Sequence, residues 1–527
     1  MNEYRICKEK ADSATLVKAL STVTGSGSSA LKAGRSALTK SEWRLLFLYG
    51  FLACLLLPVY FFYAFVVPQT PGRLARASSS LIPELSVWSA VVSLPLPLLD
   101  NSYLIAALLI IFAVVGFAAY GAAVYFSWNH QEHSYLLATI VAAAFIFFLI
   151  STWSLPNTST DIYNYMLRGR TVAVYNSNPY YVAADEFPED PIYPYASQNY
   201  TNTPGERPPA WLLINIFLAW IAGDHPVTNL LVYRFALLGF STANLILIVM
   251  ILRRLNARHV LAGAVLYSWN PIVILFGNSK TDSVMVFFLL LAILLLVVER
   301  KKIAVVLMGL SVLVKLITIP FVAVYLLRSL RQKQWRQFAV DTALLGVTTL
   351  ILYLPFLEDP RLILRLFDLL GVGGVSAPGP ALVGTLFKAL FVLAIAYVGL
   401  RPDGGNQKLL WQGAVVMLLF SVFLTRVSLS WYLLTLIGLV SLVFDWRLAV
   451  MTVSLSFLSF LYNTWQSTFG GGFDAPDLFD IPRFLVYVGL AAVVAAVIWG
   501  RSIYNSKIKN QKFLRGREYT NYENLNR

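Results

Sequence analysis

Apolar segments long enough to cross a bilayer recur along most of this 527-residue chain. A membrane-spanning helix needs about 20 mostly apolar residues. Segments that meet or approach this length occupy residues 45–67, 102–126, 134–154, 228–252, 259–276, 283–299, 337–357, 380–400, 409–425, 429–445, 448–463 and 484–500. Only 13% of the residues are charged, whereas soluble domains carry about 25%. The pattern predicts an all-α polytopic membrane protein.

Lysine and arginine gather in two terminal tails and in short loops, and the formal net charge is +14. Basic flanks stay in the cytoplasm, so we predict cytoplasmic tails at residues 1–44 and 501–527. Residues 45–500 then form the transmembrane module, with about 14 crossings. We expect the basic segments to contact anionic membrane lipids. No stretch pairs basic residues with a nucleic-acid-reading motif, so we expect no nucleic-acid partner.

Lys315 interrupts the apolar run of residues 303–327, which is basic on both flanks. Two inward flanks predict two short helices hinged near Lys315. An ionisable residue within a membrane costs about 2.5–3.5 kcal/mol on insertion scales and marks a functional site by default. Snorkelling of the side chain to the interface is the alternative.

The same orientation places a long loop, residues 155–209, on the outer side. It contains Asp161, about seven residues after an apolar segment. In a helix, side chains at i, i+3, i+4 and i+7 share a face, which would align Asp161, Asn164, Tyr165 and Arg168. The alternative is that Asp161 only marks a helix start. Residues 211–222 are too short to span and predict an interfacial or re-entrant helix.

Other outer segments carry further candidates. Lys280 departs from the positive-inside trend, which makes it a better functional candidate than an inner lysine. Asp282 follows it and begins the returning helix, where capping is the alternative role. Arg207 and Arg426 are further outer cations. The pair Trp431 and Tyr432 predicts either a stacking surface for substrate or an anchor in the aromatic belt.

Several kinds of chemistry lack their motifs. There is no P-loop, Rossmann glycine fingerprint, nucleophile elbow or HExxH in a suitable context. The two cysteines, Cys7 and Cys54, show no metal spacing. His130 and His133 stand in a short loop without further ligands. We therefore predict neither a metal site nor a cofactor.

Residues 161–165, Asp-Ile-Tyr-Asn-Tyr, are followed by Gly-Arg at 169–170 and Asn-Pro-Tyr at 178–180. This pattern resembles the first catalytic loop of GT-C fold glycosyltransferases. It is most similar to the polyprenol-phosphate-mannose-dependent α-mannosyltransferases of bacterial envelopes. The segments 269–271, 278–282, 314–316 and 431–433 fall in the order expected for that family. The resemblance covers roughly residues 130–450, and residues 278–282 read Asn-Ser-Lys-Thr-Asp where the family commonly has Asn-Gly-His-Asn-Asp.

The resemblance implies a GT-C-like bundle of about 14 transmembrane helices with outer juxtamembrane helices and loops, in the bacterial plasma membrane. It implies an inverting transfer of a hexose, mannose, from a polyprenyl-phosphate donor. The acceptor would be a hydroxyl of a lipid-linked or cell-envelope glycan on the outer face. Asp161 would act as general base. The candidates for holding the donor phosphate are Lys280, Lys315, Arg207 and Arg426. The candidates for substrate binding are Asn164, Tyr165, Arg168, Arg170, Tyr180, Asp282, Trp431 and Tyr432.

Two other functions remain open from the sequence. A transporter or lipid-carrier flippase would carry charged residues along helix interiors, and few are visible beyond Lys315. An envelope glycan polymerase or ligase would transfer a whole glycan rather than one sugar. Assays with monosaccharide and oligosaccharide donors separate this last possibility from the first.

Overall fold

The computed structural model describes residues 39–67, 101–154, 156, 159–197, 201–205, 207–277, 279–359, 381–401, 404–423 and 430–469. Within these ranges the chain forms helices and no strand, so the all-α prediction is confirmed there. Two compact units divide between Leu48 and Tyr49. The first unit is described from Thr39, where a capping box starts the first helix: Thr39 N–H donates to Glu42 Oε2, and Glu42 N–H donates to Thr39 Oγ1.

Six helices in the described part of the chain are long and apolar enough to cross a membrane. They are α2 (Lys40–Phe61, continued by the π-helix η1, Phe62–Val66), α4 (Ser102–Asn129), α5 (Ser134–Trp153), α9 (Pro226–Arg254), α15 (Trp335–Tyr353, continued by η8, Leu354–Phe356) and α20 (Trp446–Phe469). All coincide with predicted spans. The polytopic membrane fold is therefore confirmed, while the count of about 14 crossings stays a prediction, and residues 484–500 lie outside the described residues.

Shorter helices complete the described part. They are α6 (Asp161–Ala173), α8 (Pro209–Ala222), α10 (Val260–Ser268), α11 (Pro271–Gly277), α12 (Asp282–Val297), α13 (Lys301–Val314), α14 (Ile319–Arg331), α17 (Ala381–Gly399), α18 (Gly405–Phe423) and α19 (Leu433–Val440). Short 3-10 turns are η5 (Ala184–Glu186), η6 (Tyr193–Tyr195), η7 (Leu316–Thr318) and η9 (Ser430–Tyr432). The short helix α8 covers the predicted segment 211–222.

The predicted span 259–276 is broken, which the sequence analysis did not anticipate. α10 and α11 meet at a bend of 46°. Pro271 has no N–H to donate to the preceding turn, so the helix ends before it. Asn270 then caps the new helix, because its Oδ1 accepts from the N–H of Ile272 at 2.9 Å. The break aims the last turn of α11 at the loop that carries Lys280.

The predicted hinge near Lys315 is confirmed. α13 ends at Val314, and Lys315 has extended backbone angles (φ −161°, ψ 133°). The 3-10 turn η7 follows, and α14 starts at Ile319 with Pro320 in its first turn. Because the backbone is extended at Lys315, its side chain does not follow the helical repeat of α13. It lies beside the first residue of the neighbouring helix α12.

α10 and α12 pack among other helices of the second unit. Every residue of α10 is buried. Hydroxyl groups hold it in place: Tyr120 donates to the carbonyl of Leu266 at 2.7 Å, and Tyr60 donates to that of Trp269 at 2.6 Å. α12 packs against α9, α13 and α19. These contacts fix the two ends of the loop that joins α11 to α12.

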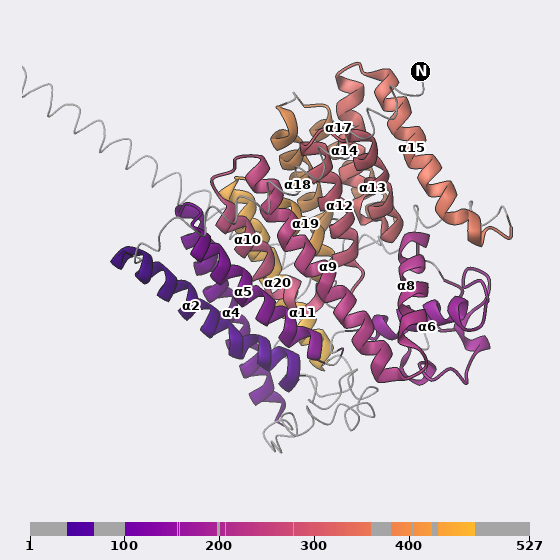
Figure 1. Cartoon of the computed structure of the whole chain (residues 1–527), viewed down its shortest axis with the longest axis horizontal. Helices are drawn as coiled ribbons and strands as arrows, with labels where there is room; N and C mark the ends of the chain where they lie inside the picture. Colours follow the sequence, from indigo (N-terminus) through magenta and orange to yellow (C-terminus); the bar gives the residue numbers. More distant parts are fainter. Residues whose placement is uncertain are drawn as a thin grey trace, which may run out of the picture. The chain divides into compact units, whose positions relative to one another are not determined.

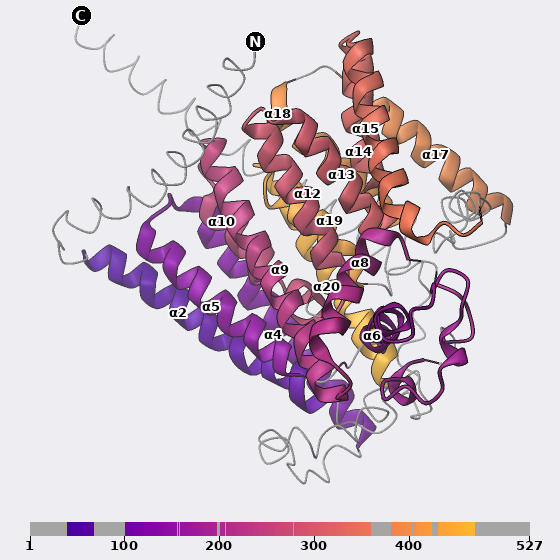
Figure 2. The same ribbon diagram turned by 45° about the vertical axis from the view of Figure 1, so that its right-hand side comes forward.

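α6 packs against α8 beside the first turns of α9 (Figures 1 and 2). Gly169 makes the close approach possible. A Cβ at this position would lie 2.5 Å from the backbone carbonyl oxygen of Asn215 in α8. The hydroxyl of Tyr233 in α9 donates to the same oxygen at 3.0 Å. A glycine here is therefore a packing requirement that sets the position of α6.

Candidate active site

Asp161 is the first residue of α6, so the predicted helix start is confirmed. Its N–H donates to Ser159 Oγ at 3.1 Å, which places the carboxylate beside the positive end of the helix dipole. One turn later, the hydroxyl of Tyr165 donates to Asp161 Oδ2 at 3.4 Å. The side chain of Asp161 is 16% exposed, so a substrate can reach it.

Two cations approach Asp161 from other parts of the chain. Lys280, in the turn between α11 and α12, places Nζ 2.7 Å from Asp161 Oδ2. Arg207, just before α8, places a guanidinium nitrogen 3.9 Å from the same oxygen. The Lys280 side chain is 1% exposed, whereas that of Arg207 is 33% exposed. The carboxylate therefore bridges a buried ammonium group and a more accessible guanidinium group.

A second buried ion pair joins Asp282 and Lys315. Asp282 is the first residue of α12 and is fully buried, and Lys315 stands at the break between α13 and α14. Nζ of Lys315 lies 2.9 Å from both carboxylate oxygens. Both Asp161 and Asp282 thus begin helices and hold a lysine that sits on a non-helical stretch of backbone.

The aromatic pair of η9 covers both lysines. Nζ of Lys280 lies 3.9 Å from the centre of the Trp431 ring, and Nζ of Lys315 lies 4.2 Å from that of Tyr432. Arg207 lies over the Tyr165 ring at 5.5 Å. Cation–π attraction of this kind holds positive charge without neutralising it. Aromatic faces therefore retain the cations where an anionic substrate could still bind them.

The site carries an excess of positive charge. Lys280, Lys315 and Arg207 are three cations, and Asp161 and Asp282 are two anions, which leaves a formal charge of +1. Burial alone raises the pKa of Asp161, but Lys280 and Arg207 outweigh it and hold the pKa well below its usual range. Asp161 is therefore ionised at neutral pH, and its basicity depends on how closely Lys280 stays beside it.

Tyr180 and Arg168 support the accessible side of the site. The hydroxyl of Tyr180 donates to the backbone carbonyl of Arg207 at 2.7 Å. Arg168, Tyr180 and Arg207 line one small cavity next to Tyr165. The structure thus brings these two predicted residues to the edge of the site, where Tyr180 positions the backbone that carries Arg207.

Arg170 takes a different direction. Its guanidinium is bound by Asp190 at 2.8 Å and by Asp224 at 2.9 Å, and it donates to the carbonyl of Gly223 at 2.6 Å. The side chain is 1% exposed. These contacts tie α6 to the loop after it and to the turn between α8 and α9, which is a scaffolding arrangement.

Asn164 is also turned away from Asp161. Its Oδ1 accepts from the N–H of Ser197 at 3.2 Å, and the residue is buried. The face predicted for α6 is therefore divided between the carboxylate and the loop that covers the helix. The remaining candidate, Arg426, lies outside the described residues.

The pairing of each lysine with a carboxylate was missed by the sequence analysis, which assigned the lysines to a phosphate alone. The partners are 119 and 33 residues apart in sequence, so no local pattern links them. One signal was available: a buried charge in an apolar setting requires an opposite charge nearby.

No group of three or more His, Cys, Asp or Glu side chains suited to a metal ion occurs among the described residues. The donor set around Asp161 consists instead of two carboxylates that are already paired with ammonium groups. Such an arrangement fits the binding of an anion better than the binding of a cation.

Comparison with known protein families finds one similarity. Residues 73–330 match the model of a family described as alpha-(1->6)-mannopyranosyltransferase, N-terminal domain. The matched range includes α6, the turn with Lys280 and the break at Lys315. The resemblance to mannosyltransferases drawn from the sequence is therefore confirmed. No curated protein and no solved structure matches the chain.

Proposed function

We propose, from the match to mannopyranosyltransferases and the charge cluster at Asp161, that this membrane protein is a glycosyltransferase that transfers mannose. The donor is a mannosyl polyprenyl phosphate, and the acceptor is a hydroxyl of a lipid-linked or cell-envelope glycan. One observation carries the proposal: a partly exposed carboxylate lies within 4 Å of two cations, one of which is buried. This combination places a base next to a site for a phosphate.

The reaction balances with these groups. The acceptor hydroxyl gives its proton to Asp161 while its oxygen bonds to the anomeric carbon of mannose. The bond between that carbon and the phosphate oxygen breaks, and polyprenyl phosphate leaves with the electron pair. The donor phosphate is a diester with one negative charge, and the product is a monoester that gains a second. Lys280, Lys315 and Arg207 stabilise this gain, because together they exceed the two carboxylates by one charge.

The ion pair between Lys280 and Asp161 represents the site before a donor binds. A carboxylate held 2.7 Å from an ammonium group is a weak base, because protonation would break the pair. A donor phosphate offers Lys280 a competing partner. As Lys280 turns toward the phosphate, the pKa of Asp161 rises and the carboxylate becomes a better base. Donor binding would therefore activate the base before the acceptor is attacked.

The aromatic rings of η9 suit the donor side of the site. Trp431 and Tyr432 lie next to the two buried lysines, so a sugar attached to the bound phosphate would lie near their faces. Aromatic rings commonly stack on the apolar faces of ligands. The cavity beside Arg168 and Tyr180 would then face the acceptor. We place this site on the outer face of the membrane, since the basic segments 253–258 and 299–302 mark the opposite side.

The test is sugar transfer by the full-length protein in lipid vesicles, with mannosyl polyprenyl phosphate as donor. Asp161→Asn keeps the size of the side chain and removes the base. We expect a loss of about 10²–10⁴-fold in turnover, as is typical for a general base. Asp185→Asn, the same change at an exposed acid of the same loop, is the matched control and should keep full activity. A guanosine-diphosphate sugar should not replace the donor.

Full turnover by Asp161→Asn would remove Asp161 as the base. Transfer from the nucleotide sugar at the same rate would contradict the proposed donor class. Movement of the lipid across the vesicle without any transfer would favour the transporter interpretation instead.

A further inference from the structure

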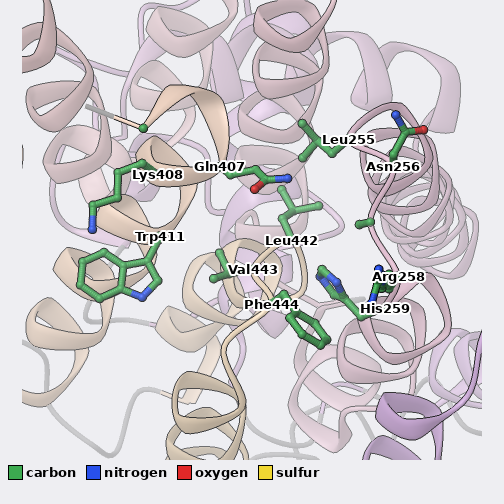
Figure 3. Close-up of a pocket in the computed structure, with 12 residues that line it drawn as sticks. Leu255, Asn256, Arg258, His259, Gln407, Lys408, Trp411, Leu442, Val443 and Phe444 are labelled. Atoms are coloured by element: carbon green, nitrogen blue, oxygen red, sulfur yellow. The ribbon is translucent and has the colours of Figure 1, made fainter. Parts of the chain in front are cut away.

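A second cavity, of about 560 Å³, lies between the end of α9, the start of α10, the start of α18 and the turn after α19 (Figure 3). Cavities of 300–1,000 Å³ are typical of sites for small ligands. Its wall combines two basic side chains, Arg258 and Lys408, with apolar and aromatic ones, among them Trp411, Leu442 and Phe444. No residue of the candidate active site contributes to it.

The cavity lies at the end of α9, whereas the start of α12, which carries Asp282, lies beside the middle of α9, where Asn244 donates to the backbone carbonyl of Ser283 at 2.9 Å. The first turns of α9 follow Asp224, which binds Arg170 of α6, whereas Leu255, which lines the cavity, follows the last residue of the helix. The broken helix runs antiparallel to α9, from His259 at the cavity to Gly277 before Lys280. The cavity therefore lies nearer the basic end of α9 than the candidate active site does.

The basic side chains of this cavity are available to an anion. Neither Arg258 nor Lys408 forms an ion pair with the described carboxylates. Lys408 instead lies over the Trp411 ring, with Nζ 4.1 Å from its centre. The nearest acid in sequence to the cavity wall, Asp445, accepts from Trp411 Nε1 at 3.1 Å. Trp411 is thus held edge-on by an acid while its face carries a cation.

His259 adds a polar group to the apolar back of the cavity. The residue is 4% exposed, and its ring extends toward the other lining residues (Figure 3). The ring forms a hydrogen bond with the backbone of Leu442 and packs against Phe444, with 4.9 Å between the ring centres. Its Nε2 has no hydrogen-bond partner among the described residues. A ligand that carries both a phosphate and a hydroxyl would meet the cations and this nitrogen together.

We propose that this cavity binds the headgroup of an anionic phospholipid. The site lies where a span ends, which is the depth of lipid headgroups. Arg258 and Lys408 bind the phosphate, and the apolar wall with the 59%-exposed Phe444 contacts the start of the acyl chains. A soluble phosphate would also bind Arg258 and Lys408, but it would not contact the apolar wall. The inference does not depend on the reaction proposed at Asp161.

Native mass spectrometry of the full-length protein tests the site, with phosphatidylglycerol as the anionic probe and phosphatidylcholine as the zwitterionic one. The double variant Arg258→Gln and Lys408→Gln should weaken the binding of phosphatidylglycerol at least tenfold. Arg254→Gln with Lys302→Gln is the matched control, because it removes one exposed arginine and one exposed lysine outside the cavity wall. That control should bind like the unmodified protein.

Equal weakening by both double variants would overturn the proposal, since a general basic surface would then explain the binding. Binding of phosphatidylcholine as strong as the binding of phosphatidylglycerol would overturn the proposal as well. Displacement of phosphatidylglycerol by millimolar inorganic phosphate would reject the lipid as the source of the phosphate. The proposal is supported if phosphatidylglycerol stays bound in the presence of inorganic phosphate and if only the double variant in the cavity loses this binding.

Discussion

At the scale of single residues, the site is organised by buried charges that neutralise one another in pairs. Lys280 has Asp161 on one side and the face of Trp431 on the other. Lys315 has Asp282 and Tyr432 in the same relation. Removing one member of such a pair leaves the other charge buried without its partner, which is strongly destabilising. The activity of variants at these positions should therefore be compared at equal amounts of folded protein.

Lys280→Gln should change the pH dependence of the reaction as well as its rate. Lys280 contributes to the lowered pKa of Asp161. Its removal should raise this pKa, because the burial of Asp161, which also raises the pKa, is then opposed by fewer charges. Asp161 must be deprotonated to act, so the acidic limb of the profile of kcat/KM should move to higher pH. An opposite charge at this range shifts a carboxyl by about one to three pH units. Steady-state rates must therefore extend down to about pH 3, where the unmodified protein should keep its rate and the variant should begin to lose it.

Lys302→Gln, an exposed lysine at the start of α13, serves as the control and should leave the profile in place. A lower rate for Lys280→Gln with an unshifted acidic limb would show that Lys280 serves the phosphate without tuning Asp161.

The sequence identifies these residues better than it identifies their partners. Asp161, Lys280 and Lys315 stand out because charges are rare in an apolar chain, and the resemblance to mannosyltransferases puts them in order. Helical periodicity aligns Asn164 with Asp161, yet Asn164 binds the backbone of Ser197. Periodicity gives the face of a helix and does not give what covers it. The partner of Lys280 is fixed only when the start of α6 meets the turn between α11 and α12.

At the scale of elements, the site depends on interruptions of helices. α10 and α11 break at Pro271, which has no N–H for the preceding turn. α13 and α14 break at Lys315, where apolar residues continue on both sides. The second break is predictable, because basic flanks at both ends of one apolar run require the chain to turn back. The first was missed, because a proline near the end of an apolar segment is compatible with one continuous span.

Gly169→Ala should displace α6 from α8 and reduce activity without touching the charged groups. The new Cβ would lie 2.5 Å from the carbonyl oxygen of Asn215, and backbone cannot move aside as a side chain does. Overpacking of this kind costs about 1–3 kcal/mol. We expect a lower Tm for the purified protein and a lower kcat, because α6 positions Asp161.

Gly239→Ala is the matched control, since no atom lies within 4 Å of a Cβ at that position of α9. Alanine favours a helix by up to about 1 kcal/mol relative to glycine, so this variant should keep or raise its Tm. A Gly169→Ala protein with unchanged Tm and activity would contradict the close packing of α6 on α8.

At the scale of the whole second unit, α9 separates two functional ends. One end holds α6 and α8 (Figure 2), and Asp161 is the first residue of α6. The other carries Arg253 and Arg254 in the last turn of α9, followed by Arg258 at the phospholipid cavity. The uneven distribution of basic residues predicts that the second end is cytoplasmic. A donor that is made in the cytoplasm would then have to present its sugar on the other side.

Chemical labelling of single cysteines tests this orientation. Cys7 and Cys54 are first replaced by serine and alanine, and Asp185→Cys or Arg254→Cys is then introduced at an exposed position. A membrane-impermeant maleimide added to intact cells should label the cysteine at position 185. It should label the cysteine at position 254 only after the membrane is permeabilised. The reverse pattern would place Asp161 in the cytoplasm, where nucleotide sugars are available, and the lipid-linked donor would lose its main topological support.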